Sequence, residues 1–125
     1  MNTCLDSWAV IDWLEDGPSA ASVEKVIPSR PVISLINVCE VLYILTKKYG
    51  VKAIQQVLPA LRQKLNFIGV DEEITLSASK IKATHKMALG DAFCVATALA
   101  HNAKILTGDP EIINAKGNWK VQDLR

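Results

Sequence analysis

Residues 89–112, LGDAFCVATALAHNAKILTGDPEI, are largely apolar but contain two aspartates that could do chemistry. Asp91 opens a helix-like run, and Asp109 directly follows the strand-like run KILT. Two earlier acids, Asp6 and Glu40, also follow apolar, strand-like runs. Carboxylates brought close together repel one another unless a cation joins them, and oxygen ligands favour Mg²⁺ or Mn²⁺ over zinc. A site of this kind can deprotonate a water and hydrolyse a phosphodiester.

The elements around these acids predict that all four share one edge of a sheet. Strand patterns (2–6, 31–34, 65–70, 103–107, 119–124) alternate with helical patterns (7–15, 20–26, 35–49, 51–64, 71–86, 90–101). This alternation predicts a parallel sheet covered by helices on both faces. In such a sheet the strand C-termini and helix N-termini meet at one edge, where ligands bind at the switch in strand order. Asp6, Glu40, Asp91 and Asp109 are all expected at that edge.

Each of these acids also has a structural explanation. Ser7, alone or with Asp6, could cap the helix that follows. Asp91 could be the N-cap of its own helix, and Asp109 could be a turn or cap residue before a proline. Glu40 is the hardest to explain in this way, because its neighbours one helical turn away are mostly apolar. A buried, ionised carboxylate there is costly unless it is paired or bound to metal.

Several polar residues near the acids could assist them. Ser7 and Thr107 could orient a metal-bound water, although capping and strand packing explain them at least as well. Glu111 is a weaker fifth acid, whose position in a first helical turn suits the helix dipole. His85 could lie near the mouth of the pocket. Late lysines of the 71–86 helix could form a basic rim for phosphates or simply a solvated helix face: Lys80, Lys82 and Lys86.

Length and composition indicate one domain over residues 1–125. Half of the residues are apolar, and 14 basic against 13 acidic residues give a net charge of +1. This balance predicts no strong field for nucleic acid or membrane, although a basic rim can lie beside an acidic pocket. Three cysteines without disulfide or zinc spacing, and no signal-like or membrane-length apolar run, predict a cytoplasmic protein with no membrane association.

Four pieces of the chain occur in a characteristic order: LDSWAVIDWLE (5–15), ISLINVCEVLY (33–43), LGDAFCVATALAHNAKILTGD (89–109) and the closing WKVQDL. With these four pieces in this order, the sequence resembles the PIN-domain family, particularly the VapC-type toxins of prokaryotic toxin–antitoxin pairs. Two positions depart from the family pattern. Ser7 stands where a threonine is common, and Gly90 stands where family members more often have proline or alanine.

The resemblance implies a three-layer α/β/α Rossmann-like fold with a short, mainly parallel central sheet. It implies a divalent-metal-dependent endoribonuclease that hydrolyses RNA phosphodiesters with a metal-activated water, using Mg²⁺ or Mn²⁺. Asp6, Glu40 and Asp91 match the core metal-binding acids, and Asp109 matches a more variable fourth. The resemblance also implies a homodimer that is held inactive by a cognate antitoxin.

The alternative is a catalytically inactive binding module, either PIN-like or receiver-like. A receiver would have an acidic pair after the first strand, whereas LDSW has one acid. A phosphatase of the haloacid dehalogenase type would have a second aspartate where Trp8 stands. The presence of all four acids favours an active nuclease.

Overall fold

Five strands and seven α-helices alternate along residues 2–125, the part of the chain that the computed structural model describes. In chain order the elements are β1 (Asn2–Leu5), α1 (Ser7–Leu14), α2 (Ala20–Val26), the 3₁₀ turn η1 (Ile27–Ser29), β2 (Val32–Ser34), α3 (Leu35–Tyr49), α4 (Val51–Lys64), β3 (Asn66–Ile68), α5 (Glu72–Thr84), α6 (Leu89–Ala100), β4 (Ala103–Thr107), α7 (Pro110–Ile113) and β5 (Val121–Asp123). Within this part no helix is long and apolar enough to cross a membrane.

The five strands form one sheet in the order β3-β2-β1-β4-β5, and every pairing is parallel. The chain runs outward from β1 to β2 and β3, and then returns to place β4 on the other side of β1. The switch in strand order therefore lies between β1 and β4, which is where ligands bind in sheets of this kind. Leu5 pairs with Leu106, so the next residues lie side by side at the strand ends: Asp6 follows β1, and Thr107 is the last residue of β4.

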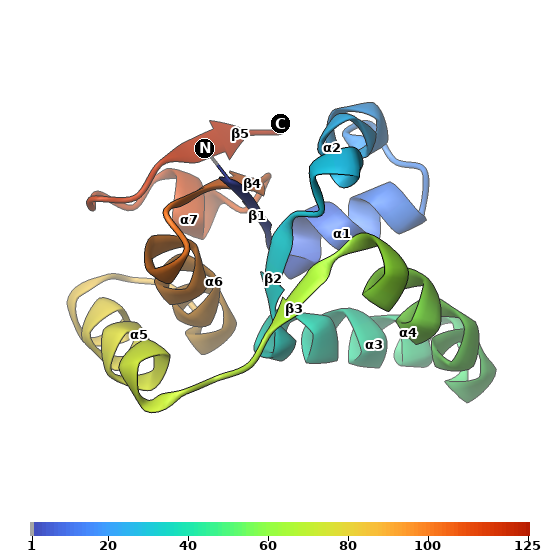
Figure 1. Ribbon diagram of the computed structural model, residues 1–125, viewed down its shortest axis with the longest axis horizontal. Coiled ribbons are helices and arrows are strands. Elements are labelled where there is room, and N and C mark those ends of the chain that lie inside the picture. The colour runs from blue at the N-terminus through green and yellow to red at the C-terminus, as the bar shows by residue number, and fades with distance from the viewer. Residues whose placement is uncertain (1) are drawn as a thin grey trace.

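Helices cover both faces of the sheet, which confirms the predicted three-layer architecture (Figure 1). Helices α5, α6 and α7 pack on one face, and α1 to α4 pack on the other. The strands supply alternate residues to the two cores: Cys4 and Ile105 face the first layer, whereas Leu5 and Leu106 face the second. Burying each large aliphatic side chain contributes about 1.5–3 kcal/mol, so both layers hold the strand ends in place.

The structure corrects the sequence expectations at a few element ends. Asp6, and not Ser7, caps α1, because its carboxylate accepts the Ala9 N–H. β3 is confined to Asn66–Ile68 because it is an edge strand that pairs only with the three residues of β2. A helical turn at Glu111 was expected without bounds, and the structure shows the short helix α7, which Asp109 caps and Pro110 begins.

Candidate metal centre

Asp6 lies where β1 ends and α1 begins, and its side chain is 2% exposed. Its Oδ1 accepts the backbone N–H of Ala9 at 2.8 Å, and its Oδ2 accepts the hydroxyl of Thr107. Burial raises the pKa of Asp6 to about 7; the two hydrogen bonds oppose this rise, and the charge of Asp109 adds to it. Asp6 is therefore both a helix cap and a buried carboxyl group at the strand-order switch.

Thr107 connects two of the predicted acids. Its hydroxyl donates to Asp6 and accepts the backbone N–H of Asp109 at 2.9 Å. This contact fixes the start of the turn after β4 relative to the start of α1. Ser7, the other predicted water-orienting residue, is half-buried and lines a hollow of about 300 Å³ that Asp109 also lines. Their water-orienting role stays a prediction.

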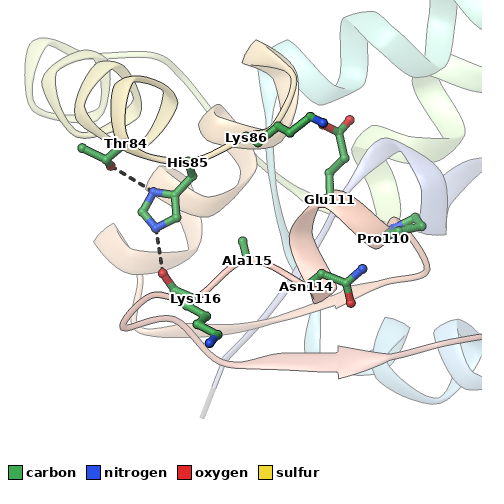
Figure 2. A pocket seen from close by; sticks show the side chains of 8 residues that line it. All are labelled: Thr84, His85, Lys86, Pro110, Glu111, Asn114, Ala115 and Lys116. Carbon is green, nitrogen blue, oxygen red and sulfur yellow. Dashed lines mark hydrogen bonds between the residues drawn. The ribbon is translucent and has the colours of Figure 1, made fainter.

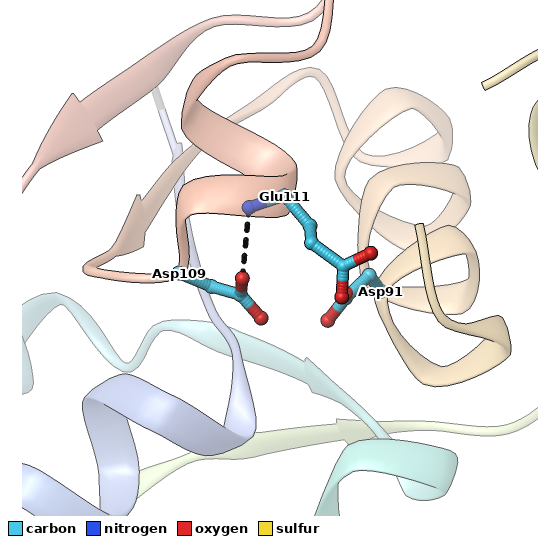
Figure 3. Close-up of side chains that lie close together, drawn as sticks. All are labelled: Asp91, Asp109 and Glu111. Atoms are coloured by element: carbon cyan, nitrogen blue, oxygen red, sulfur yellow. Dashed lines mark hydrogen bonds between the residues drawn. The ribbon is translucent and has the colours of Figure 1, made fainter. Parts of the chain in front are cut away.

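Three carboxylates converge beside this contact: Asp91, Asp109 and Glu111 (Figure 3). One oxygen from each residue lies within 4.8 Å of the others. Asp91 comes from the first turn of α6, which begins at the N-cap Ala88, so the capping explanation of Asp91 is wrong. Asp109 does cap α7, because its Oδ1 accepts the Glu111 N–H at 2.9 Å. This hydrogen bond uses Oδ1, so the other carboxylate oxygen of Asp109 remains available to the group of three acids.

The electrostatics of this group favour a cation. Asp91 is 8% exposed, and its Oδ2 is buried without a hydrogen-bond partner among the described residues. The pKa of Asp91 is raised to about 7, most by burial and then by the nearby charges of Asp109, Glu111 and Asp6. Neither of the ion pairs within residues 2–125 involves these acids. A set of hard oxygen donors with uncompensated charge and an unpartnered buried oxygen fits Mg²⁺ or Mn²⁺.

Glu40 borders the group of three without being part of it. Its Oε1 accepts the side-chain N–H of Asn37 at 2.8 Å, and the same nitrogen donates to the Gly90 carbonyl at 3.1 Å. The Glu40 carboxylate lies against Gly90, where a Cβ would collide with it. Asn37 thus fastens Glu40 to the first turn of α6, directly beside Asp91.

The sequence analysis did not give two residues of the site, Glu111 and Asn37, their full place in it. From the sequence, Glu111 is a weaker candidate than the other four acids, whereas in the structure its carboxylate lies close to those of Asp91 and Asp109. Its position two residues after Asp109, at the start of the same short helix, was the sequence feature that could have indicated its place in the site. Asn37 was not predicted as a site residue; its position three residues before Glu40, one helical turn away, was the available sign of this contact.

An α/β/α domain with carboxylates at the switch point of a parallel sheet belongs to the class of Rossmann-like domains that bind ligands at the strand ends. Residues 3–118 match the family described as the PIN domain, and the chain belongs to this family. A search of curated proteins finds no match.

Solved structures share the fold over nearly the whole chain. A toxin–antitoxin complex from Klebsiella pneumoniae matches with a TM-score of 0.81 and 23% identity, covering 99% of this chain and 98% of that chain. A DNA-bound VapBC from Salmonella typhimurium matches with a TM-score of 0.81 and 14% identity, covering 100% and 99%. VapBC-1 from nontypeable Haemophilus influenzae matches with a TM-score of 0.77 and 21% identity, covering 99% and 98%. At these identities the likeness establishes the fold.

Proposed function

We propose that this PIN domain is a divalent-metal-dependent endoribonuclease and the toxin component of a VapBC-type pair. The observation that carries the proposal is the convergence of Asp91, Asp109 and Glu111, with the buried Oδ2 of Asp91 lacking a partner. Membership of the PIN family supports nuclease chemistry. The choice of RNA as substrate comes from the resemblance to VapC-type toxins.

Asp91, Asp109 and Glu111 would hold Mg²⁺ or Mn²⁺, with Asp6 and Glu40 beside them. When bound, the cation supplies Lewis acidity toward a phosphodiester and lowers the pKa of water. Asp6 is kept in place by the Ala9 N–H and the Thr107 hydroxyl, so its carboxylate is fixed before substrate arrives. Burial raises the pKa of Asp6 to about 7 in the metal-free protein, and a cation held beside Asp6 would lower this pKa and favour the carboxylate.

We infer a cognate antitoxin as partner, because the similar structures include a toxin–antitoxin complex and VapBC complexes bound to DNA. A homodimer and a cytoplasmic location follow from the resemblance and the composition, and both stay predictions. Exposed apolar side chains on α3, at Leu35 and Tyr43, are compatible with a contact between copies. The alternative is an inactive PIN-like module that binds its partner but cleaves nothing.

The test compares cation binding and RNA cleavage in the same preparations. Metal-free protein is titrated with Mg²⁺ or Mn²⁺ by calorimetry, and single-stranded RNA is incubated with each loaded sample. Asp91→Asn should lose both activities. Glu73→Gln is the matched control, because this exposed acid packs near Ala100 at the opposite end of α6 and should retain both. Full cleavage by Asp91→Asn would overturn the proposal, whereas cation binding without any cleavage by the wild type would identify the inactive module.

A further inference from the structure

A pocket of about 500 Å³ opens beside the candidate metal centre (Figure 2). Its walls come from the end of α5 with the residues after it, and from α7 with the loop that follows: Thr84, His85, Lys86, Pro110, Glu111, Asn114, Ala115 and Lys116. We call it the lysine pocket. Its volume falls within the range of about 300–1,000 Å³ that is usual for small-ligand sites. Glu111 belongs both to this pocket and to the group of three acids, so the two sites are continuous.

His85 fastens the two walls of the lysine pocket together. Its Nε2 lies 2.7 Å from the Lys116 carbonyl and donates to it, and its Nδ1 lies 3.0 Å from the Thr84 hydroxyl. The imidazole also packs edge-on against Trp119, with the ring centroids 5.1 Å apart. These contacts join segments some thirty positions apart in the sequence, so the pocket has fixed walls before any ligand binds (Figure 2).

The charge of the lysine pocket is opposite to that of the metal centre. Lys86 and Lys116 are exposed on its walls, and neither belongs to an ion pair within residues 2–125. Asp109 also lines a second hollow, together with Asp12 and with Glu15, whose charge is compensated by the ion pair with Lys48; no lysine or arginine lines this hollow. A polyanion whose reacting phosphate lies at the acids therefore meets unpaired cations in the lysine pocket, whereas the second hollow offers it none.

We propose that the lysine pocket binds the nucleotide next to the scissile phosphate of a single-stranded RNA, a subsite that rests on the proposed nuclease function. Lys86 and Lys116 contact the adjoining phosphate as point charges. The exposed amide of Asn114 can donate to and accept from a base edge, which single-stranded RNA leaves open. Pro110 and Ala115 offer apolar surface to the ribose and base.

The test measures binding of a fluorescein-labelled single-stranded RNA to metal-free protein in EDTA, by anisotropy at several salt concentrations. The double variant Lys86→Gln/Lys116→Gln should bind roughly tenfold or more weakly. Its log–log salt slope should be smaller by about 0.7, because both lysines contact the one adjoining phosphate and each phosphate contact on a single strand contributes about 0.7. The double variant Lys25→Gln/Lys52→Gln is the control; it changes the net charge equally, on helices of the opposite face, and should bind nearly as well as the wild type. Equal losses in the two double variants would overturn the subsite.

Cleavage assays separate failure of the subsite from failure of the nuclease proposal. With Mg²⁺ or Mn²⁺ present, the pocket double variant should raise KM with little change in kcat, since its contacts are made equally in the ground and transition states. Asn114→Ala should change the base preference next to the cut in a randomised RNA. Wild-type cleavage with both variants unaffected overturns the subsite and leaves the nuclease intact. If the wild type neither cleaves nor binds RNA, the subsite and the nuclease proposal are both overturned. If the lysine substitutions weaken binding of an antitoxin peptide but leave RNA binding unchanged, the pocket is reassigned to a protein partner.

Discussion

Asp6→Asn should stabilise the metal-free protein, and the gain should grow as the pH rises. The folded protein holds the Asp6 proton with a pKa of about 7, whereas the ordinary value is 3.8. Because this pKa is raised on folding, the stability that protonated Asp6 provides is complete below pH 4 and is lost as the pH rises through 7. The loss from this one group amounts to about 4 kcal/mol at pH 8 and about 2 kcal/mol at pH 5.

Asparagine removes the charge and keeps an oxygen for the Ala9 N–H, so the cap of α1 survives. In EDTA at pH 8, we expect Asp6→Asn to be more stable than the wild type by up to about 4 kcal/mol. This advantage should shrink by about 2–3 kcal/mol at pH 5. Urea unfolding at both pH values measures it, and equal m-values confirm that the same surface is exposed. Glu73→Gln, at an exposed position, should show no such change with pH.

The cation provides a second arm of the same experiment. At pH 8, saturating Mg²⁺ or Mn²⁺ should stabilise the wild type in proportion to RT ln(1 + [L]/Kd) and should stabilise Asp6→Asn less. The reasoning is refuted if the stability difference between the two proteins is the same at pH 5 and pH 8. It is refuted as well if the wild type gains from alkaline pH relative to the variant.

Three further substitutions probe the surroundings of the candidate metal centre. Asn37→Ala leaves Glu40 Oε1 and the Gly90 carbonyl without their donor, so it should cost about 1–3 kcal/mol in urea unfolding and weaken cation binding measured by calorimetry. Gly90→Ala places a Cβ where the Glu40 carboxylate lies, so it should displace Glu40 from Asn37 and slow RNA cleavage. Gly69→Ala, at an open position, should leave cleavage unchanged. Glu111→Gln should reduce cation affinity by roughly tenfold or more and lower the pKa of Asp91, and an unchanged calorimetric Kd would remove Glu111 from the site.

The fold was predictable because its signals are local and repeated. Short apolar runs that alternate with helical patterns specify a parallel sheet, and Gly50 marks the end of α3 where the sequence places it. The acids at the strand ends were predictable for the same reason. Once β1 and β4 are parallel neighbours, the residues that follow Leu5 and Leu106 must lie side by side at the same end of the sheet.

Which of the acids lie together could not be predicted from the sequence, because this depends on how far side chains of different helices and strands extend toward one another. Sequence position places Glu40 and Glu111 at the same edge of the sheet, but only the structure shows that Glu40 turns to Asn37 and Gly90. Glu111 lies instead with Asp91, through the short helix α7. Asp109 and Pro110 signal the start of α7, but four residues are too few for a periodic pattern, so the sequence does not show that this helix brings Glu111 to Asp91.

The hydrogen bond between Thr107 and Asp6 spans 101 positions of the chain, and this has a consequence for the order of events during synthesis. A nascent chain that ends before β4 has the central strand β1 with one edge unpaired, and such an edge is prone to wrong pairing. That fragment contains Asp6 but lacks Asp109 and Glu111, so it cannot assemble the acidic group. The nuclease we propose therefore cannot form its acidic group on the ribosome until residues 109–111 have emerged.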